Sequence, residues 1–429
     1  MFATACRIFW LITLVISFGV GQSLLAQSTP LNLNLERDWP WWRGPAGNGL
    51  VPGQQTVPTR FGENENLLWK SPVPGRGHSS PIVVNGKVYL ATADEQDEIQ
   101  SVLCYDLNNG KQEWQKTVNR GGFPANNHPK NTEASPTVAS DGQRLFVTFF
   151  HHRQVELVAM TMSGDPVWTK KVCDFNPRMF EYGYAPSPVI FEDLIVVAAE
   201  YDGASFVVAY DRASGKEVWR TARPGGITFS SPIVGHVAGR DQLLLSGVGS
   251  ITSYDPKTGT ELWQVPGTAL ATCGTAVWND DLVFASGGYP QSETLAVDAH
   301  GTGKRVWQNN QKCYEQSMIL VDGFLYALTD KGVLYCWRGS DGQEMWRERL
   351  AGPVSSSPIL ANGNLYWANE RGTIYVLRAN SARFELVAEN TLGSEIFASP
   401  AVSGNRLLWR VAEGTKENRK EFLYCFGNH

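Results

Sequence analysis

The sequence has few features that point to catalysis. It contains no HExxH, GxSxG or CxxC motif and no P-loop, so nothing supports the metalloprotease, α/β-hydrolase, dithiol oxidoreductase or P-loop NTPase classes. No nucleophile and base can be paired from their spacing. Charged residues make up 18% of the 429 residues, and the formal net charge is −5. This mildly acidic balance argues against a nucleic-acid partner, which would require a basic patch.

Long apolar runs are also scarce, and the one that bears on targeting lies at the amino terminus. Ile8 to Val20 is apolar and follows Arg7, but it is shorter than the roughly 20 residues needed to span a bilayer. Leu24-Leu25-Ala26 offers a small residue for cleavage, and no cysteine follows directly to accept a lipid. We predict a signal peptide over residues 1–26, cleaved near Ala26, with a signal anchor as the alternative. The mature chain is then secreted or periplasmic, without a membrane span.

The rest of the chain repeats one unit. In residues 78–114 this unit is a Ser-Pro pair, two strands, a third strand ending in Tyr-Asp, a turn with Gly, and a strand containing Trp. The predicted inner strands begin at Ser80-Pro81, Ser135-Pro136, Ser187-Pro188, Ser231-Pro232, Thr275-Ala276, Ser317-Met318, Ser357-Pro358 and Ser399-Pro400. The predicted outer strands contain Trp114, Trp168, Trp219, Trp263, Trp307 and Trp346, and a further one near Phe384 has lost its Trp.

The strand count balances only if the ends of the chain meet. Residues 66–70, with Trp69, resemble the end of a unit although they precede the first one, and the chain stops after a third strand. We predict that this early strand completes the last unit, so that no sheet edge is exposed at the junction. The Trp residues are 39 to 54 residues apart, which suits four short strands. The predicted fold is all-β: an eight-bladed β-propeller of four-stranded antiparallel blades.

The recurrent residues have structural explanations. The turn Gly supplies a positive φ before the outer strand, and the recurrent Trp is predicted to be a wedge that fills the gap between neighbouring blades. Before the repeats, residues 27–65 are predicted to form a tether and a Trp-rich strap. Its Trp39, Trp41 and Trp42 are expected to be buried against the propeller, with an aromatic ligand platform as the alternative. Residues 66–429 then form the propeller.

The cysteines do not suggest a disulfide framework. Cys104, Cys336 and Cys425 share one position of the repeat, so they should lie far apart and serve as small buried apolar residues. Cys273 and Cys313 lie near the starts of adjacent units, and the sequence leaves open whether they pair. Cys173 has no evident partner.

The repeat resembles that of a known family. The segment Tyr254-Asp255-Pro256-Lys257-Thr258-Gly259-Thr260-Glu261-Leu262-Trp263 is similar to the PQQ-type propeller repeat of quinoprotein alcohol dehydrogenases and of the outer-membrane assembly lipoprotein BamB. The resemblance covers residues 66–426. The Trp-Pro-Trp-Trp-Arg-Gly-Pro segment at 39–45 and the run 128–136 look like secreted planctomycete-type members named for the repeat.

In the dehydrogenases, the resemblance implies PQQ on the propeller axis, facing Ca²⁺ and usually flanked by a ring made from two adjacent cysteines. This chain has no adjacent cysteine pair and lacks the long inserted loops that enclose the cofactor. We therefore predict no cofactor, and retain PQQ with Ca²⁺ only as an alternative.

Candidate site residues come from the segments that precede the inner strands, because propeller ligands usually bind where these segments converge on the channel mouth. The long loop 119–133 contributes the main cluster, His128, Lys130 and Glu133, since long loops on rigid scaffolds often carry function. Glu133 and Glu315 are the candidate Ca²⁺ ligands, with solvated loop carboxylates as the alternative. The candidate partner-binding residues are His78, His128, Lys130, Asn131, Glu133, Arg178, Tyr182, Tyr184, Tyr314 and Glu315. Arg178, Tyr182 and Tyr184 are included because Arg and aromatic residues are enriched in interface hot spots, with local packing between blades 2 and 3 as the alternative.

The sequence predicts the fold more closely than the function. The mature chain consists almost entirely of repeats and has no recognisable catalytic residues. This favours a monomeric binding or scaffold module whose loop face binds a protein or polysaccharide in the cell envelope. The alternatives are a reduced PQQ- and Ca²⁺-dependent dehydrogenase and a carbohydrate-binding propeller. No catalytic residue is assigned.

Overall fold

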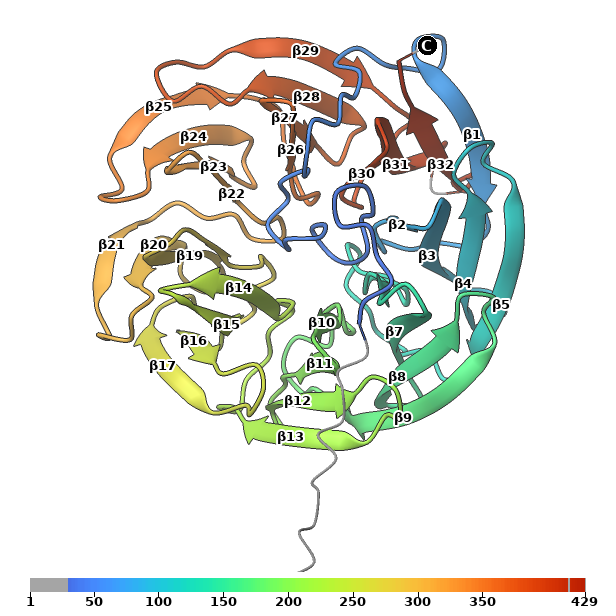
Figure 1. The fold of residues 1–429 in the computed structure, drawn as a ribbon, viewed down its shortest axis with the longest axis horizontal. Helices are drawn as coiled ribbons and strands as arrows, with labels where there is room; N and C mark the ends of the chain where they lie inside the picture. The colour runs from blue at the N-terminus through green and yellow to red at the C-terminus, as the bar shows by residue number, and fades with distance from the viewer. Residues whose placement is uncertain (1–29, 416, 429) are drawn as a thin grey trace, which may run out of the picture.

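A computed structural model describes residues 30–415 and 417–428. The predicted signal peptide, residues 1–26, lies outside the described residues. Eight four-stranded antiparallel sheets form a closed ring, which Figure 1 shows down its axis. The prediction of an eight-bladed propeller is confirmed. The described part of the chain has no helix long and apolar enough to cross a membrane.

The blades follow one another along the chain, each from its inner to its outer strand. Blade 1 comprises β2 (Ile82–Val84), β3 (Lys87–Asp94), β4 (Ile99–Asp106) and β5 (Gln112–Arg120); blade 2 comprises β6 (Ala139–Ser140), β7 (Arg144–His151), β8 (Gln154–Thr161) and β9 (Pro166–Asp174). Blade 3 comprises β10 (Val189–Phe191), β11 (Leu194–Ala199), β12 (Phe206–Asp211) and β13 (Glu217–Ala222); blade 4 comprises β14 (Ile233–Val237), β15 (Arg240–Gly247), β16 (Ser250–Tyr254) and β17 (Glu261–Pro266).

The second half of the ring repeats this order. Blade 5 comprises β18 (Val277–Trp278), β19 (Leu282–Gly287), β20 (Glu293–Asp298) and β21 (Arg305–Asn309); blade 6 comprises β22 (Ile319–Val321), β23 (Phe324–Leu328), β24 (Val333–Arg338) and β25 (Glu344–Arg349). Blade 7 comprises β26 (Ile359–Ala361), β27 (Asn364–Ala368), β28 (Thr373–Arg378) and β29 (Leu386–Thr391); blade 8 comprises β30 (Ala401–Ser403), β31 (Arg406–Glu413), β32 (Lys420–Phe426) and the early strand β1 (Leu67–Val73).

The ring closes as predicted, through the early strand. β1 pairs antiparallel with β32, with Trp69 opposite Cys425 and Ser71 opposite Leu423. Side chains strengthen the same junction: Arg410 of blade 8 donates through Nη1 to the Ala91 carbonyl of blade 1 at 2.7 Å. Its guanidinium also pairs with Glu421 at 2.6 Å, and both side chains are buried.

A second set of hydrogen bonds links the blades around the channel. In seven of the eight blades, the residue two positions before the inner strand offers its hydroxyl oxygen to the backbone N–H of the equivalent residue in the preceding blade. Seven such bonds, of 2.8 to 3.2 Å, join Ser80, Thr137, Ser187, Ser231, Thr275, Ser317, Ser357 and Ser399 among the described residues. Such pairing satisfies buried backbone donors that the short inner strands leave free.

This ring of hydroxyl groups corrects one prediction. Blade 2 was predicted to begin its inner strand at Ser135-Pro136, but β6 begins at Ala139 and Thr137 takes the ring position. Ser135 instead belongs to the preceding loop, where its hydroxyl donates to the Asn131 side chain. The error arose because Ser135-Pro136 matches the repeat pattern but lies two residues before Thr137, which occupies the ring position.

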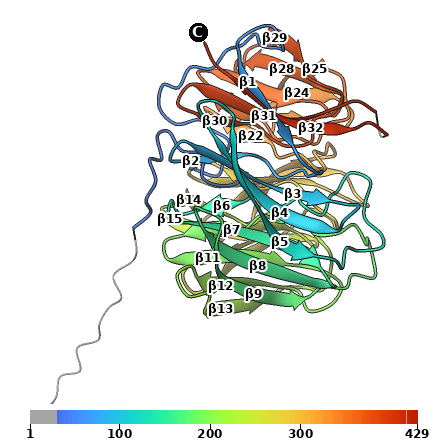
Figure 2. The same ribbon diagram turned by 90° about the vertical axis from the view of Figure 1, so that its right-hand side faces the viewer.

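The Trp-rich strap crosses one face of the ring, where Figures 1 and 2 show it in blue. Trp39 and Val83 exchange two backbone hydrogen bonds, so the strap adds a bridge to the inner strand of blade 1. Trp39 and Trp41 are only 2% and 8% exposed, which confirms the prediction for these two indoles, whereas Trp42 is half-buried and donates to the Thr275 hydroxyl at 2.9 Å. The buried Arg43 donates to the Met318 carbonyl of blade 6 at 2.8 Å, and burial lowers its pKa to about 9.

Candidate functional site

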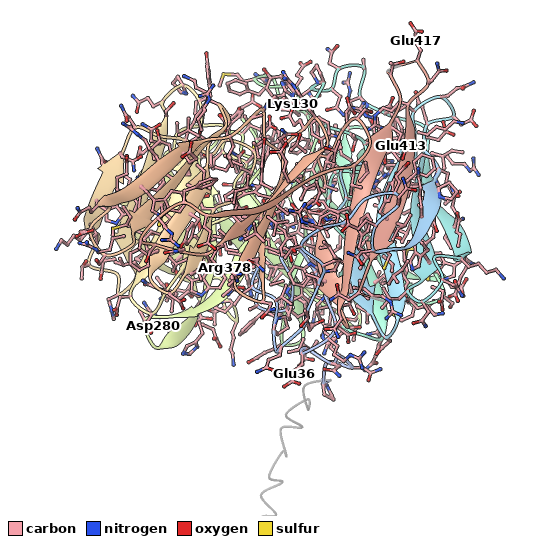
Figure 3. The ribbon with its side chains drawn as sticks, turned by 90° about the horizontal axis from the view of Figure 1, so that it is seen from above. Glu36, Lys130, Asp280, Arg378, Glu413 and Glu417 are labelled. Carbon is pink, nitrogen blue, oxygen red and sulfur yellow. The ribbon has the colours of Figure 1, made fainter. Side chains whose placement is uncertain are left out.

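A pocket opens at the channel mouth on the face opposite the strap. Figure 3 shows Glu36 of the strap segment and Lys130 of the pocket on opposite faces. Twelve residues line it: His78, His128, Lys130, Asn131, Ser135, Tyr182, Phe229, Cys273, Tyr314, Glu315, Ser355 and Phe397. Most of them lie just before an inner strand, so the ring geometry brings residues of distant sequence position to one place.

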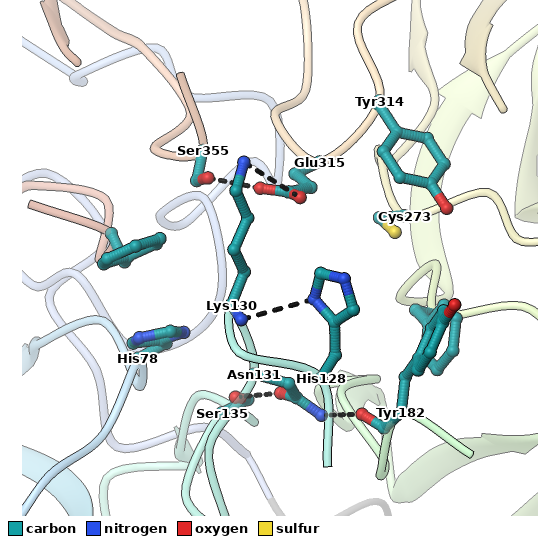
Figure 4. A pocket seen from close by; sticks show the side chains of 12 residues that line it. His78, His128, Lys130, Asn131, Ser135, Tyr182, Cys273, Tyr314, Glu315 and Ser355 are labelled. Atoms are coloured by element: carbon teal, nitrogen blue, oxygen red, sulfur yellow. Dashed lines mark hydrogen bonds and ion pairs between the residues drawn. The ribbon is translucent and has the colours of Figure 1, made fainter. Parts of the chain in front are cut away.

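Lys130 crosses the mouth of this pocket toward Glu315, as Figure 4 shows, and also pairs with Glu370. Its Nζ lies 2.7 Å from Glu370 Oε1 and 3.5 Å from Glu315 Oε1. Burial would lower the pKa of Lys130, but the two carboxylates outweigh it and raise that pKa. For Glu315, burial has the opposite sign and raises the pKa, although Lys130 and Ser355 act to lower it. The ammonium therefore stays charged, and Glu315 takes up a proton more readily than an ordinary carboxylate.

The Ser355 hydroxyl joins the two carboxylates. It donates to Glu370 Oε1 at 2.7 Å and also contacts Glu315 Oε2. Ser355 lies two residues before Ser357 of the hydroxyl ring, and Glu315 lies two residues before Ser317, so the ring fixes the spacing of both. We refer to Glu315, Ser355 and Glu370 together as the carboxylate cradle.

Aromatic rings form the walls on either side of Lys130. His78 stacks on Phe397 with ring centroids 4.4 Å apart, and Tyr182 stacks on Phe229 at 6.2 Å. Burial, and the nearby charges of Arg76, Arg410 and Arg419, hold the pKa of His78 well below its usual range. The pocket therefore presents mostly apolar walls around the Lys130–Glu315 pair.

The aromatic wall continues out of the pocket as an exposed ridge. Phe180 contacts Tyr182 on its inner side and Tyr289 on its outer side, both with centroids 5.7 Å apart. Tyr289 is 54% exposed and the neighbouring Met179 is 48% exposed. We refer to Met179, Phe180 and Tyr289 as the aromatic ridge. Exposed apolar groups that adjoin a pocket are typical of interaction sites.

The structure brings together most of the predicted site residues. His78, His128, Lys130, Asn131, Tyr182, Tyr314 and Glu315 all line the pocket. Asn131 also holds the pocket loops together, because its amide donates to the Tyr182 carbonyl of the loop between β9 and β10. Whether these residues bind a partner stays a prediction.

Three predicted residues lie elsewhere. Tyr184 is a buried core residue whose hydroxyl donates to the Ala198 carbonyl at 2.8 Å. Arg178 is exposed on the loop between β9 and β10, and its backbone N–H donates to Asp202. Glu133 accepts from Asn127 at 2.9 Å and faces a separate small cavity. None of the three residues lines the pocket.

The prediction of a Ca²⁺ site at Glu133 and Glu315 does not fit this arrangement. The two carboxylates face different cavities, and Glu315 is already held by Lys130 and Ser355. Within residues 30–415 and 417–428, no three His, Cys, Asp or Glu side chains are grouped to hold a metal.

Sequence reasoning missed Cys273, Ser355 and Glu370. Cys273 and Ser355 precede ring residues Thr275 and Ser357, so the repeat position could have identified them. Glu370 lies in the turn between β27 and β28, and nothing in the sequence pattern indicates that its carboxylate meets Lys130 and Ser355. Cys273 and Cys313 are both free thiols.

A family model described as outer membrane protein assembly factor BamB matches residues 61–130, 98–347 and 291–385. The chain belongs to this family. BamB of Burkholderia pseudomallei is 25% identical over 322 residues, which is 74% of this chain and 68% of that relative. BamB of Legionella pneumophila is 26% identical over 188 residues, which is 42% of this chain and 47% of that relative.

Solved propellers share the fold. The europium-containing methanol dehydrogenase superposes with a TM-score of 0.67 at 12% identity, covering 92% of this chain and 98% of its own. BamB from Moraxella catarrhalis gives a TM-score of 0.59 at 14% identity, covering 85% and 98%. The quinohemoprotein alcohol dehydrogenase from Comamonas testosteroni gives 0.65 at 14% identity, covering 93% and 82%. At these identities the likeness concerns the fold alone.

The pocket does not suit PQQ, which carries three carboxylates. The cation that lines the pocket, Lys130, is already shared by two carboxylates, so the charge near a bound quinone would be negative rather than positive. Burying uncompensated like charges is costly. Cys273 also lines the pocket as a single free thiol. The residues present therefore fit this cofactor poorly.

Proposed function

We propose that this BamB-family propeller is a non-catalytic binding or scaffold module of the cell envelope, and that the pocket face docks a protein partner. The observation that carries the proposal is the continuity of the pocket with the aromatic ridge. Tyr182, Phe180 and Tyr289 form one unbroken series of ring contacts from the channel mouth to the surface. Large rings of this kind dominate the energetics of protein interfaces.

The family relationship supports the same proposal. The curated relatives are described as outer membrane protein assembly factors, and an assembly factor works through contacts with other proteins. The signal-like residues 1–26 are consistent with a secreted or periplasmic location. A monomer that presents one loop face is the state we propose for the free protein, and analytical ultracentrifugation measures it directly.

Site-specific photo-crosslinking tests the docking face. A photoreactive amino acid is placed at Tyr289 or Met179 on the ridge, and at Val218 or Leu386, which are 51% and 44% exposed on outer strands. These outer-strand positions are matched in exposure but lie away from the pocket. We expect one discrete adduct from the ridge positions in the native envelope and none from the outer strands. Equal adducts from all four positions, or none from the ridge, would contradict the proposal.

A second measurement separates this proposal from a dehydrogenase. The purified protein is mixed with PQQ and Ca²⁺, and the cofactor absorption spectrum is recorded with and without an alcohol and a dye acceptor. We expect an unshifted spectrum and no dye reduction, because the pocket is poorly matched to an anionic quinone. Turnover under these conditions would overturn the non-catalytic assignment.

A further inference from the structure

The carboxylate cradle already holds a primary ammonium group, and that group comes from far away in the chain. Lys130 belongs to the loop between β5 and β6, yet its Nζ pairs with Glu370, 240 residues later in blade 7. The Lys130 side chain remains 34% exposed, whereas the side chains of Glu370 and Glu315 are 10% and 21% exposed. An accessible cation therefore occupies a mostly buried acceptor site.

The cradle is held in place without help from Lys130. The Glu370 backbone N–H donates to the Pro353 carbonyl at 2.9 Å, and Ser355 bridges the two carboxylates. Beside Glu315, the Tyr314 N–H donates to Asp330 at 2.7 Å. Removing the Lys130 ammonium would thus leave two facing carboxylates in position, with one hydroxyl between them.

The loop that carries Lys130 is also held by other groups. Arg76 Nη2 donates to the Pro129 carbonyl at 3.0 Å, and the Asn131 N–H donates to the His128 carbonyl at 2.8 Å. The Lys130 N–H donates to the His128 ring at 3.2 Å. Since these bonds use the backbone and neighbouring side chains, the Lys130 side chain can leave the cradle without unfolding its loop.

The chemistry of the pocket selects for a lysine-type group. The two carboxylates each receive one contact from the compact ammonium rather than a paired contact from a planar fork, which suits lysine better than arginine. The walls of His78, Phe397 and Tyr314 can pack against an aliphatic stem, and aromatic faces attract cations. With both carboxylates ionised, the cradle and Lys130 together carry a net negative charge.

We propose that the carboxylate cradle is a binding site for the lysine side chain of a partner polypeptide, and that Lys130 occupies it in the free protein and is displaced on docking. This inference rests on the proposed function, because it assigns a ligand class to the same face. Charge complementarity argues for a basic segment, and the adjoining aromatic ridge argues for an apolar residue beside the lysine.

The test uses Lys130→Ala, which removes the side chain beyond Cβ. n-Propylammonium replaces the missing atoms, so we expect Lys130→Ala to bind it at least about tenfold more tightly than the wild type in isothermal titration, as the loss of an internal competitor predicts. 1-Propanol, which lacks the charge, should not bind. Adding Glu370→Gln to Lys130→Ala should weaken amine binding about tenfold.

Peptides then test the ligand class. A short peptide with one lysine should bind Lys130→Ala more tightly than the wild type, and the same peptide acetylated at the lysine Nε should not bind. If Lys130→Ala binds neither n-propylammonium nor the lysine peptide more tightly than the wild type does, the inference is overturned. Should Lys130→Ala not fold, the wild type compared with Glu370→Gln on the same ligands decides the question, and equal affinities would refute the inference.

The two proposals fail in different ways. Ridge-specific crosslinks combined with no amine binding would leave the docking face intact and remove only the lysine assignment. Absent crosslinks combined with amine binding would show a lysine-type site that is not part of a protein-docking face.

Discussion

The indole Nε1–H of Trp69 donates to the Leu107 carbonyl oxygen of blade 1 at 2.9 Å. The same contact recurs around the ring, since Trp219, Trp307 and Trp346 donate to backbone carbonyls of the next blade at 2.7 to 3.1 Å. Trp69 comes from the early strand β1, so the junction between the chain ends uses the same chemistry as the covalently continuous blade interfaces. The predicted role of the repeat Trp as a wedge between blades agrees with these contacts.

The wedge fits because the next blade offers a glycine beneath it. A Cβ built on Gly110 would lie 2.5 Å from the Trp69 ring, whereas a Cβ on Gly86 would meet nothing within 4 Å. Both glycines have a similar positive φ, 70° and 75°, so the backbone cost of alanine is matched. We expect Gly110→Ala to destabilise the protein by about 2 kcal/mol more than Gly86→Ala, through overpacking. Urea unfolding of the two variants measures this difference, and equal midpoints would contradict it.

The junction also depends on a buried ion pair. Glu421 and Arg410 have side chains that are each 2% exposed, so removing the carboxylate charge leaves a buried guanidinium without its counterion. We expect Glu421→Gln to cost about 4 kcal/mol of unfolding free energy. Glu217→Gln breaks the exposed pair with Arg220 and should cost less than about 1 kcal/mol. Thermal unfolding of both variants measures the two losses of stability. Similar losses would show that breaking the buried pair at the junction costs no more than breaking an exposed pair.

The hydroxyl ring can be tested with two substitutions at one position. Ser357 Oγ accepts from the buried Ser317 N–H at 2.9 Å, so Ser357→Ala leaves that donor unpaired. The expected loss is about 2 kcal/mol. Ser357→Thr keeps the hydroxyl, and the chain itself uses threonine at ring position 137, where Thr137 Oγ1 accepts from the Ser80 N–H at 3.2 Å. Chemical denaturation should therefore show Ser357→Thr close to wild type; equal losses for both variants would refute the ring as a stabilising element.

The fold could be predicted from sequence because each blade repeats the same local requirements. A hydroxyl residue lies two positions before the inner strand, a positive-φ Gly forms the outer turn, and Trp fills the gap to the next blade. The single register error arose where Ser135-Pro136 imitates this pattern in the loop before Thr137. The repetition makes the fold predictable, since seven correctly placed inner strands outweigh the one that was misplaced.

The site was less predictable because it is built from loop and turn residues that do not follow the repeat pattern. Tyr184 and Tyr182 lie two residues apart, yet one hydrogen-bonds inside the core and the other lines the pocket. Glu370 reaches the pocket from a hairpin turn that looks like any other in sequence. Side-chain direction within irregular loops is set by tertiary packing, which periodicity does not encode.

The raised pKa of Glu315 gives a pH dependence with a definite sign. Its folded-state pKa lies above its unfolded value because burial disfavours the carboxylate, so the folded protein binds the proton more tightly. The contribution of Glu315 to stability therefore falls as pH rises through the folded-state pKa, and is regained on acidification. We expect the unfolding free energy of the wild type, relative to Glu315→Gln, to increase as the pH is lowered toward the ordinary glutamate pKa of about 4.3. Urea titrations across this range measure the difference, and a constant or decreasing difference would contradict the assignment.

The six described cysteines make the last prediction, which concerns oxidation. All six are free, and burial raises the pKa of the Cys273 and Cys313 thiols well above the usual range. Because the thiolate is the reactive form, both should resist oxidation and alkylation in the native protein. Protein produced in an oxidising compartment, then unfolded and alkylated without prior reduction, should carry the label on all six, as mass spectrometry can count. Protection of Cys273 together with Cys313 would reveal a disulfide between adjacent blades and contradict the free-thiol structure, while a Cys273→Ser control should remove one label and leave the other five.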